Sequence, residues 1–207
     1  KSLSTYTYTV RAVNGSNISS FNYAGKSVKH LTAPTISISN STTGVYLQWN
    51  RITGANSYYV YRKAGNAKYW TKIDTVTGNS YLDRNVKAGV AYTYTIRAYG
   101  SKTLSGCNSY GWKTVYLNTP KLVSALSYPN GVTVKWQKVP VATWYAVFRK
   151  AEGDKSWTLV GKTTGNANVT YVDKNVQQGV TYTYTVRACY GNYRSWFQSG
   201  IKCEVNY

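Results

Sequence analysis

The chain has 207 residues, 43% of them hydrophobic, and it contains 22 tyrosines and 7 tryptophans. This composition suffices for packed cores and excludes an intrinsically disordered chain. Lys and Arg number 25 against 6 Asp and Glu, for a net charge of +19. The excess favours contact with polyanions, although the basic residues are scattered along the whole chain and also fit a generally basic surface. No apolar run approaches the roughly 20 residues that span a bilayer.

One phrase of eight residues recurs three times. The copies are "TYTYTVRA" (5–12), "AYTYTIRA" (91–98) and "TYTYTVRA" (181–188). The sequence before the last two copies matches as well, as in "YLDRNVKAGV" (81–90) and "YVDKNVQQGV" (171–180). The pattern predicts two full repeats, at 33–118 and 119–207, with a proline near the start of each.

Residues 1–32 match only the end of a repeat. We expect them to be the C-terminal strands of a further repeat, so that the sequence is a fragment of a longer tandem array. The alternative is that strands of a neighbouring chain complete this partial repeat by β-augmentation.

Each full repeat contains about seven short runs with period-two alternation, separated by Gly, Asn, Asp and Pro. In the last repeat the runs fall near 121–126, 131–137, 144–151, 157–163, 169–173, 181–190 and 200–206. Such spacing predicts an all-β fold of two-sheet sandwiches. In residues 91–98 the alternation predicts Tyr92, Tyr94, Ile96 and Ala98 on the buried face, and Thr93, Thr95 and Arg97 on the outer face.

Two tryptophans and two tyrosines indicate a known family. The repeats resemble fibronectin type III domains of the variety found in tandem along surface proteins of Gram-positive bacteria. Trp49 and Trp136 match the buried tryptophan of the family's second strand, and the sixth-strand pattern fits around Tyr92 and Tyr182. The resemblance implies seven-stranded sandwiches arranged as beads on a string, a tyrosine corner at Tyr92 and Tyr182, and an extracellular or cell-surface location.

The acidic residues do not suggest catalysis. Asp83 and Asp173 occupy the same repeat position, where a turn-stabilising role explains them, and the other four acids are isolated. His30 is the only histidine, so no Ser–His or Cys–His arrangement recurs. Because no carboxylate pair or set of metal ligands is evident either, we expect a non-enzymatic chain without a cofactor or a metal.

The three cysteines leave alternatives open. Cys189 on the outer face of the sixth predicted strand and Cys203 on the seventh would form a disulfide if they lie opposite each other, and would otherwise be free thiols. Cys107 falls in a loop where the other copies have Phe21 and Phe197, so it is interpreted as a small apolar plug.

A row of rings and arginines lies on the predicted outer face of the sheet. Its members are Tyr59, Tyr61, Trp70, Arg97 and Tyr99 in one repeat, and Phe148, Trp157 and Arg187 in the next. Such a row would stack on sugars or bases. The alternative is that Arg97 and Arg187 lie across rings of their own chain in cation–π stacks, and the recurrence in both repeats favours this structural role.

The loop at 190–199 is the richest of those in which the copies diverge. It contains Tyr193, Arg194, Trp196 and Phe197, which are residue types that dominate binding hot spots. Recognition of a partner is one interpretation of this loop. The other is that its rings cover the end of the sandwich or pack on a following domain.

These features predict a non-catalytic spacer and adhesion module, from a larger bacterial surface or secreted protein. Its basic faces would attach weakly to anionic cell-wall polymers, and its other contacts would be with neighbouring repeats. The alternative is recognition of a glycan or a host protein through loop 190–199 or the faces of Trp70 and Trp157. Nucleic-acid binding ranks last because no nucleic-acid-binding motif is recognised.

Overall fold

The computed structural model describes residues 3–207, and residues 1 and 2 of the predicted partial repeat lie outside this range. The fold is all-β, as predicted: the described residues form strands, turns and loops and no helix. Two compact units are present. One comprises the chain up to Ser37 with Gln48–Tyr81 and Thr93–Trp112, and the other comprises Ile38–Leu47, Leu82–Tyr92 and Lys113–Tyr207. The boundaries at 33–118 and 119–207 stay predictions.

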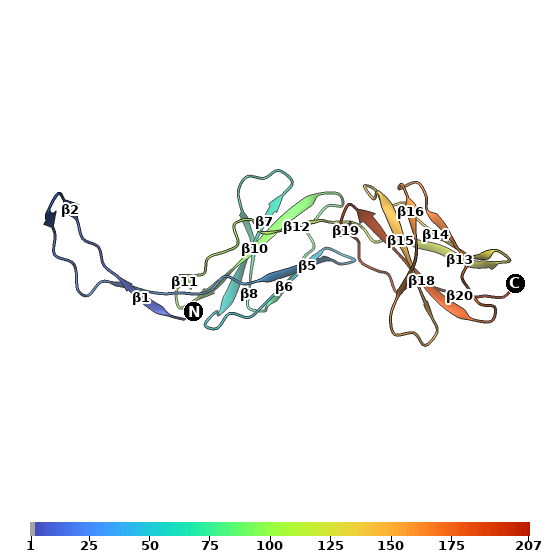
Figure 1. Cartoon of the computed structure of the whole chain (residues 1–207), viewed down its shortest axis with the longest axis horizontal. Helices are drawn as coiled ribbons and strands as arrows, with labels where there is room; N and C mark the ends of the chain where they lie inside the picture. The colour runs from blue at the N-terminus through green and yellow to red at the C-terminus, as the bar shows by residue number, and fades with distance from the viewer. Residues whose placement is uncertain (1–2) are drawn as a thin grey trace. The chain divides into compact units, whose positions relative to one another are not determined.

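The N-terminal segment is a two-stranded ribbon (Figure 1). Strand β1 (Thr5–Tyr8) pairs antiparallel with β4 (Lys26–Lys29), and β2 (Val13–Asn14) pairs with β3 (Asn17–Ile18). Every residue of these four strands is exposed. Val10 is 86% exposed, whereas Ile96, at the same position of the next copy, is 1% exposed. The ribbon therefore carries core-type side chains that the full repeats bury.

The next eight strands form two sheets. Their bounds are β5 (Ile36–Asn40), β6 (Val45–Trp49), β7 (Ser57–Ala64), β8 (Thr71–Val76), β9 (Ser80–Asp83), β10 (Ala91–Gly100), β11 (Thr103–Leu104) and β12 (Trp112–Val115). One sheet has the order β5-β6-β9, and the other has the order β11-β10-β7-β8, with β12 also paired to β10. Residues of β6 alternate between buried and exposed, because Val45, Leu47 and Trp49 all face the core.

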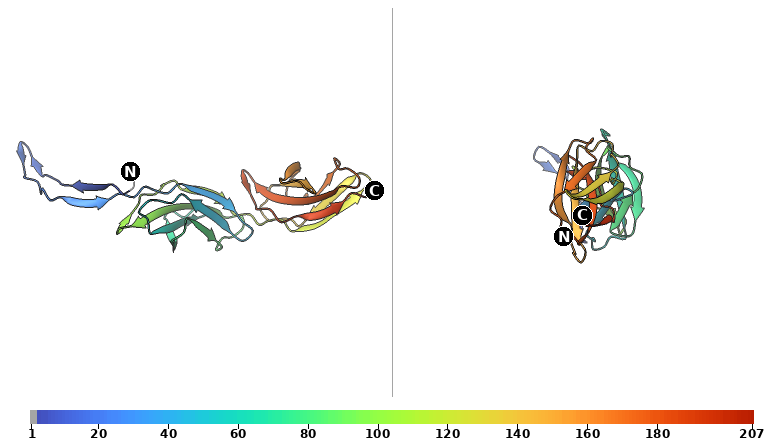
Figure 2. Two further views of the ribbon diagram at one scale, coloured as in Figure 1. Left: turned by 90° about the horizontal axis from the view of Figure 1, so that it is seen from below. Right: turned by 90° about the vertical axis from the view of Figure 1, so that its right-hand side faces the viewer.

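The last eight strands repeat this arrangement. They are β13 (Leu122–Tyr128), β14 (Gly131–Trp136), β15 (Trp144–Ala151), β16 (Thr158–Thr164), β17 (Thr170–Asp173), β18 (Thr181–Tyr190), β19 (Tyr193–Arg194) and β20 (Ile201–Glu204). Sheet β13-β14-β17 and sheet β16-β15-β18-β19, with β20 also paired to β18, form two layers (Figure 2). The core between them contains Val132, Val134, Tyr145, Val147 and Tyr184. The short strands β11 and β19 were not among the predicted runs.

The buried tryptophan and the tyrosine corner lie where the family resemblance implies. Trp49 and Trp136 are buried, and each lies against a tyrosine ring, at centroid distances of 5.4 and 5.3 Å. The backbone N–H of Lys87 donates to the Tyr92 hydroxyl over 2.8 Å, and that of Gln177 donates to Tyr182 over 3.3 Å. Each bond ties the turn before the long strand to that strand's first core residue.

One glycine is required by its surroundings. Gly131 follows the β13–β14 turn with φ of 124°, and a Cβ there would lie 2.2 Å from the Asp173 carbonyl oxygen. Only a residue without a side chain therefore lets β14 approach β17 this closely.

Candidate ligand-binding surfaces

The rings predicted on the outer face of the last repeat, Phe148 and Trp157, both contact Phe197 of loop 190–199. Phe197 lies nearly parallel to Trp157, with centroids 6.3 Å apart, and meets Phe148 edge-on at 5.3 Å. The Arg187 guanidinium lies 4.5 Å from the centroid of Phe197, and the Lys150 ammonium lies 5.2 Å from that of Trp157. The predicted cation–π stack of Arg187 is therefore present, and much of this ring surface is covered by the chain's own groups.

The arginine of this cluster is held in the same way in all three copies. Its Nε donates to a serine carbonyl eight residues later, over 2.5 Å from Arg11, 2.6 Å from Arg97 and 2.7 Å from Arg187. Arg11 also stacks on Phe21, at 5.1 Å. For Arg97 the predicted ring stack is not among the described contacts, because the matching position holds Cys107, which has no ring. Cys107 is exposed, so its interpretation as an apolar plug was wrong.

Lysines cover the rings of the preceding repeat. The Lys63 ammonium lies 4.5 Å from the centroid of Trp70, and that of Lys72 lies 4.4 Å from Tyr59, which stacks on Tyr99. These lysines were not among the predicted residues. The signal was available, because Lys63 follows Tyr61 by two residues in β7, as Lys150 follows Phe148 in β15, so each pair shares one face of its strand.

The aromatic rings of the loop at 190–199 differ in how far they are exposed to solvent. Ser195 is fully buried, and its hydroxyl accepts from the Ala188 N–H over 3.0 Å. Phe197 joins the ring cluster, and Trp196 meets Phe197 edge-on at 6.1 Å while 45% of it stays exposed. Arg194 lies 5.7 Å from the centroid of Trp144, and Tyr193 forms β19 with it. The loop therefore covers one part of the sheet and exposes one large ring.

This covering corrects part of the predicted outer face. Thr95, Thr185 and Cys189 are buried, although alternation placed Thr95 and Cys189 outside. Loop carbonyls explain the two threonines: Thr95 donates to Asn108 over 3.0 Å, and Thr185 donates to Gln198 over 3.2 Å. Alternation assigns a face of the strand, but it does not show which part of that face a loop covers.

Strand register decides between the alternatives for the cysteines. Cys203 pairs with Tyr182 across β18 and β20, seven residues from Cys189, which pairs with Trp144 and Arg194. All three cysteines are free thiols. Burial raises the pKa of the Cys189 and Cys203 thiols. A disulfide between these two cysteines, left open by the sequence, is therefore excluded by the pairing.

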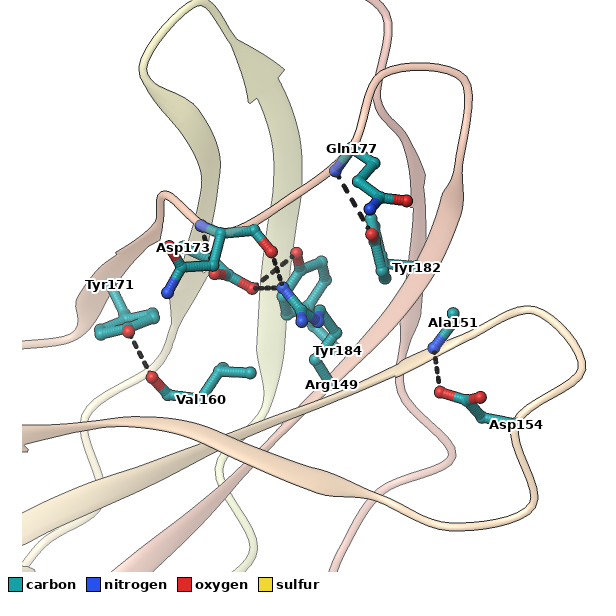
Figure 3. Close-up of polar contacts among 10 residues, drawn as sticks. Arg149, Ala151, Asp154, Val160, Tyr171, Asp173, Gln177, Tyr182 and Tyr184 are labelled. Atoms are coloured by element: carbon teal, nitrogen blue, oxygen red, sulfur yellow. Dashed lines mark hydrogen bonds and ion pairs between the residues drawn. The ribbon is translucent and has the colours of Figure 1, made fainter.

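A buried polar network surrounds Asp173 (Figure 3). The carboxylate oxygen Oδ2 lies 2.7 Å from Nη1 of Arg149 and accepts from the Tyr184 hydroxyl over 3.1 Å. Oδ1 accepts from the Asn175 backbone N–H over 3.1 Å, which is the predicted turn-stabilising role. Burial and the neighbouring carboxylate raise the pKa of Tyr184. The ion pair with Arg149 was not predicted, since it joins two strands 24 residues apart.

Metal-binding clusters and membrane-crossing helices were both sought in the described part of the chain. Residues 3–207 contain no group of three or more His, Cys, Asp or Glu side chains that could hold a metal ion. No helix in the same range is long and apolar enough to cross a membrane.

Several known proteins are similar in sequence, although no family model matches the chain. Exoglucanase B of Cellulomonas fimi is 28% identical over 190 residues, which is 79% of this chain and 16% of that protein. Fibronectin type III domain-containing protein 7 of Mus musculus is 28% identical over 158 residues, 75% of this chain and 20% of that protein. Poly(3-hydroxybutyrate) depolymerase of Ralstonia pickettii is 36% identical over 58 residues, 28% of this chain and 11% of that protein. The chain thus spans a fifth or less of each relative.

Two solved structures are also similar. The chicken CNTN1 FN1–FN3 domains match with a TM-score of 0.42 and 16% identity, over 100% of this chain and 79% of theirs. A two-domain fibronectin type III segment of chicken tenascin matches with a TM-score of 0.40 and 20% identity, over 86% of this chain and all of that segment. Strand order and sequence similarity together make the fold fibronectin type III-like.

Proposed function

We propose that this chain is a non-catalytic, extracellular spacer and attachment module of a larger bacterial protein. Its repeats hold other parts of that protein at a distance, and its basic surface attaches weakly to anionic cell-wall polymers. The partial repeat at 1–32 and the two full repeats at 33–118 and 119–207 are its units. Contact with neighbouring repeats is part of the same proposal.

The main support for this proposal is the excess of basic over acidic side chains on the surface. Of the 6 acidic residues, Asp83 and Asp173 are buried, so only four carboxylates face solvent against 25 Lys and Arg in the chain. A surface with such an excess attracts any polyanion over a Debye length of roughly 8 Å at physiological salt. The relatives add support, because this chain matches only 16% of an exoglucanase and 11% of a depolymerase, as an accessory segment of a larger enzyme would.

The covered rings favour the spacer over a general aromatic binding face. Lys63 lies over Trp70, Lys150 over Trp157 and Arg187 over Phe197. A ligand that stacked on these rings would first have to displace the Lys or Arg side chain that already makes a cation–π contact with each ring.

Cosedimentation of the full chain with purified cell walls tests the proposal. We expect binding to walls that carry anionic polymers at low salt, and its loss at about 0.5 M salt, where the Debye length falls below roughly 5 Å. Walls stripped of their anionic polymers are the control. Retention on the stripped walls at high salt would contradict charge-driven attachment.

One observation supports a second candidate function, the recognition of a glycan or a host protein through loop 190–199. Trp196 is 45% exposed two residues after Arg194, and Trp and Arg are among the residue types enriched in binding hot spots. The variant Trp196→Ala would abolish such binding at high salt and would leave binding to anionic walls at low salt unchanged.

A further inference from the structure

A basic cavity lies on the compact unit that contains the last repeat. Its volume is about 250 Å³, and residues of β5, β12, β18 and β19 line it together with the turn between the last two strands. All nine lining residues belong to this one unit, and all are described. Among these nine are Lys113, Arg187 and Arg194, but no Asp or Glu. The cavity therefore suits a small anionic group, since pockets for drug-sized ligands measure roughly 300–1,000 Å³.

The two arginines of this cavity are close enough to affect each other. Burial, together with the positive charge of Arg194, lowers the pKa of the Arg187 guanidinium. Neither arginine forms an ion pair with a carboxylate within residues 3–207. Like charges that lie together without a carboxylate repel each other, and an anion between them would remove this repulsion.

Contacts with the chain hold both guanidinium groups in place. Arg187 donates through Nε to the Ser195 carbonyl over 2.7 Å, and its guanidinium lies 4.5 Å from the centroid of Phe197. The guanidinium of Arg194 lies 5.7 Å from the centroid of Trp144. Among the described residues the Nη groups of Arg187 have no acceptor, so they can donate to an oxygen ligand in the cavity.

A buried asparagine fixes the backbone at Arg194. Asn40 is 6% exposed, and its Nδ2 donates to the carbonyl oxygens of Val115 and Arg194, over 2.9 Å each. These bonds use both N–H groups of the amide, and they join β5 to β12 and to β19. Lys113 lies on β12 two residues before Val115. The strands that carry two of the three cations are thus tied together before a ligand arrives, which reduces the entropy lost on binding.

The arginine at position 194 is peculiar to the last repeat. It directly precedes Ser195, whereas the residue before the matching serine is Ile18 in the first copy and Leu104 in the second. The serine hydroxyl accepts the same backbone N–H bond in all three copies, so the shared fold does not require a charge beside it. Arg194 therefore adds a cation to the cavity at a position that is apolar in the other copies.

We propose that this cavity binds a phosphate group of a polyol phosphate polymer. Guanidinium groups match the geometry of phosphate and donate two hydrogen bonds side by side. The three cations come from β12, β18 and β19, and such an arrangement suits a tetrahedral phosphate better than a planar carboxylate. The exposed Ser39 hydroxyl and Asn192 amide supply further donors. This inference rests on the proposed attachment to anionic polymers, and it names one place where such a polymer is held.

The surroundings suit a polyol phosphate better than a nucleic acid strand. Proteins that bind single strands stack successive bases on aromatic rings. Tyr193 is a single ring among the nine lining residues, and the Trp144 ring beside Arg194 is also contacted by the Lys162 ammonium, at 5.5 Å. Successive bases therefore find no row of free rings at this cavity. A polyol phosphate has no base to stack, so it needs no such row.

Titration of the full chain with a short poly(glycerol phosphate) tests the inference, at about 0.15 M salt to limit general charge effects. The test variant is Lys113→Gln with Arg194→Gln, which removes two cations of the cavity. The control is Lys135→Gln with Lys155→Gln, which removes two exposed lysines elsewhere on the same unit. We expect the test variant to weaken binding at least roughly tenfold, and the control to weaken it less than roughly threefold. Thermal unfolding of all three should be the same, because the replaced side chains are exposed.

The outcomes separate this inference from the proposed function. Equal weakening in the test and control variants would overturn the cavity as a site and leave general attachment in place. No binding of the parent chain to poly(glycerol phosphate) or to any other polyanion would overturn both. Equal affinity for polygalacturonate, lost in the test variant, would overturn the preference for phosphate. Tighter binding of a single-stranded DNA oligomer, lost in the same variant, would overturn the assignment of a polyol.

Discussion

Arg149 and Asp173 form an ion pair inside the last repeat, with Nη1 2.7 Å from Oδ2 and side-chain exposures of 19% and 2%. Asp173 ends β17 in one sheet and Arg149 lies on β15 in the other, so the pair joins the two layers. The guanidinium also lies 4.6 Å from the Tyr182 ring, next to the tyrosine corner. A charged group in this position is stable only with its partner.

Removal of the Asp173 carboxylate should destabilise the protein. We expect Asp173→Ala to lower the free energy of unfolding by about 3 kcal/mol, because Arg149 would keep its charge in a partly buried place without its partner. Urea unfolding measures the change. Glu152→Gln is the matched control, since the Glu152–Lys202 pair is exposed and should change stability by less than about 0.5 kcal/mol. A similar loss of unfolding free energy in both variants would contradict the claim that the buried ion pair matters more for stability than the exposed one.

Stability should fall at alkaline pH. Burial raises the pKa of Tyr116, Tyr145, Tyr171 and Tyr184 above that of an unfolded chain. Above about pH 10 the unfolded chain releases these protons and the folded chain keeps them, so the free energy of unfolding drops as pH rises. Below that pH these tyrosines are protonated in both the folded and the unfolded chain, so they make no contribution to the pH dependence of the free energy of unfolding. Each such tyrosine contributes to this fall only between the pKa of the unfolded chain and its own raised pKa.

Urea unfolding at several pH values checks this expectation. Tyr184→Phe should lower stability at neutral pH, through the lost hydrogen bond to Asp173, and should reduce the slope above about pH 10. An unchanged alkaline slope in this variant would show that Tyr184 does not supply it.

The three thiols should react at different rates. Cys107 is exposed, while Cys189 and Cys203 are buried with raised pKa values. A thiol reagent should therefore label Cys107 quickly in the folded protein, and all three cysteines after denaturation without a reductant. If only one thiol reacted after denaturation, Cys189 and Cys203 would be joined and the strand register would be wrong.

Exchange of one residue between the repeats tests the ring cluster. Phe197→Cys should destabilise the last repeat by about 1–3 kcal/mol, because Arg187 and Trp157 lose the ring that they contact. Cys107→Phe should stabilise the preceding repeat by a smaller amount, because it gives Arg97 a ring. Thermal unfolding measures both changes. A neutral Phe197→Cys would show that the stack contributes little.

The fold could be predicted because it depends on local patterns. The repeated phrase and its alternation predicted β18, and the predicted run at 157–163 is β16, Thr158–Thr164, shifted by one residue. Trp49 and Trp136 are buried as the resemblance implies, because a large apolar ring in a strand has few other places to lie.

The contacts that decide the candidate sites could not be predicted in this way. Asp173 with Arg149, and Cys203 opposite Tyr182, depend on the register between strands, which a run of alternating residues does not specify. The burial of Thr95 and Cys189 depends on the contacts around the strand, and the covering of Trp70 depends on the rotamer of Lys63.

The affinity of the full chain for a purified anionic cell-wall polymer, measured against salt concentration, tests the central claim most directly. Charge-driven attachment predicts that the logarithm of the binding constant falls linearly with the logarithm of salt, with a loss of at least roughly tenfold between 50 and 200 mM. A neutral polysaccharide should not bind in the same range. An affinity for the anionic polymer that stays constant over these concentrations would contradict attachment by the basic surface.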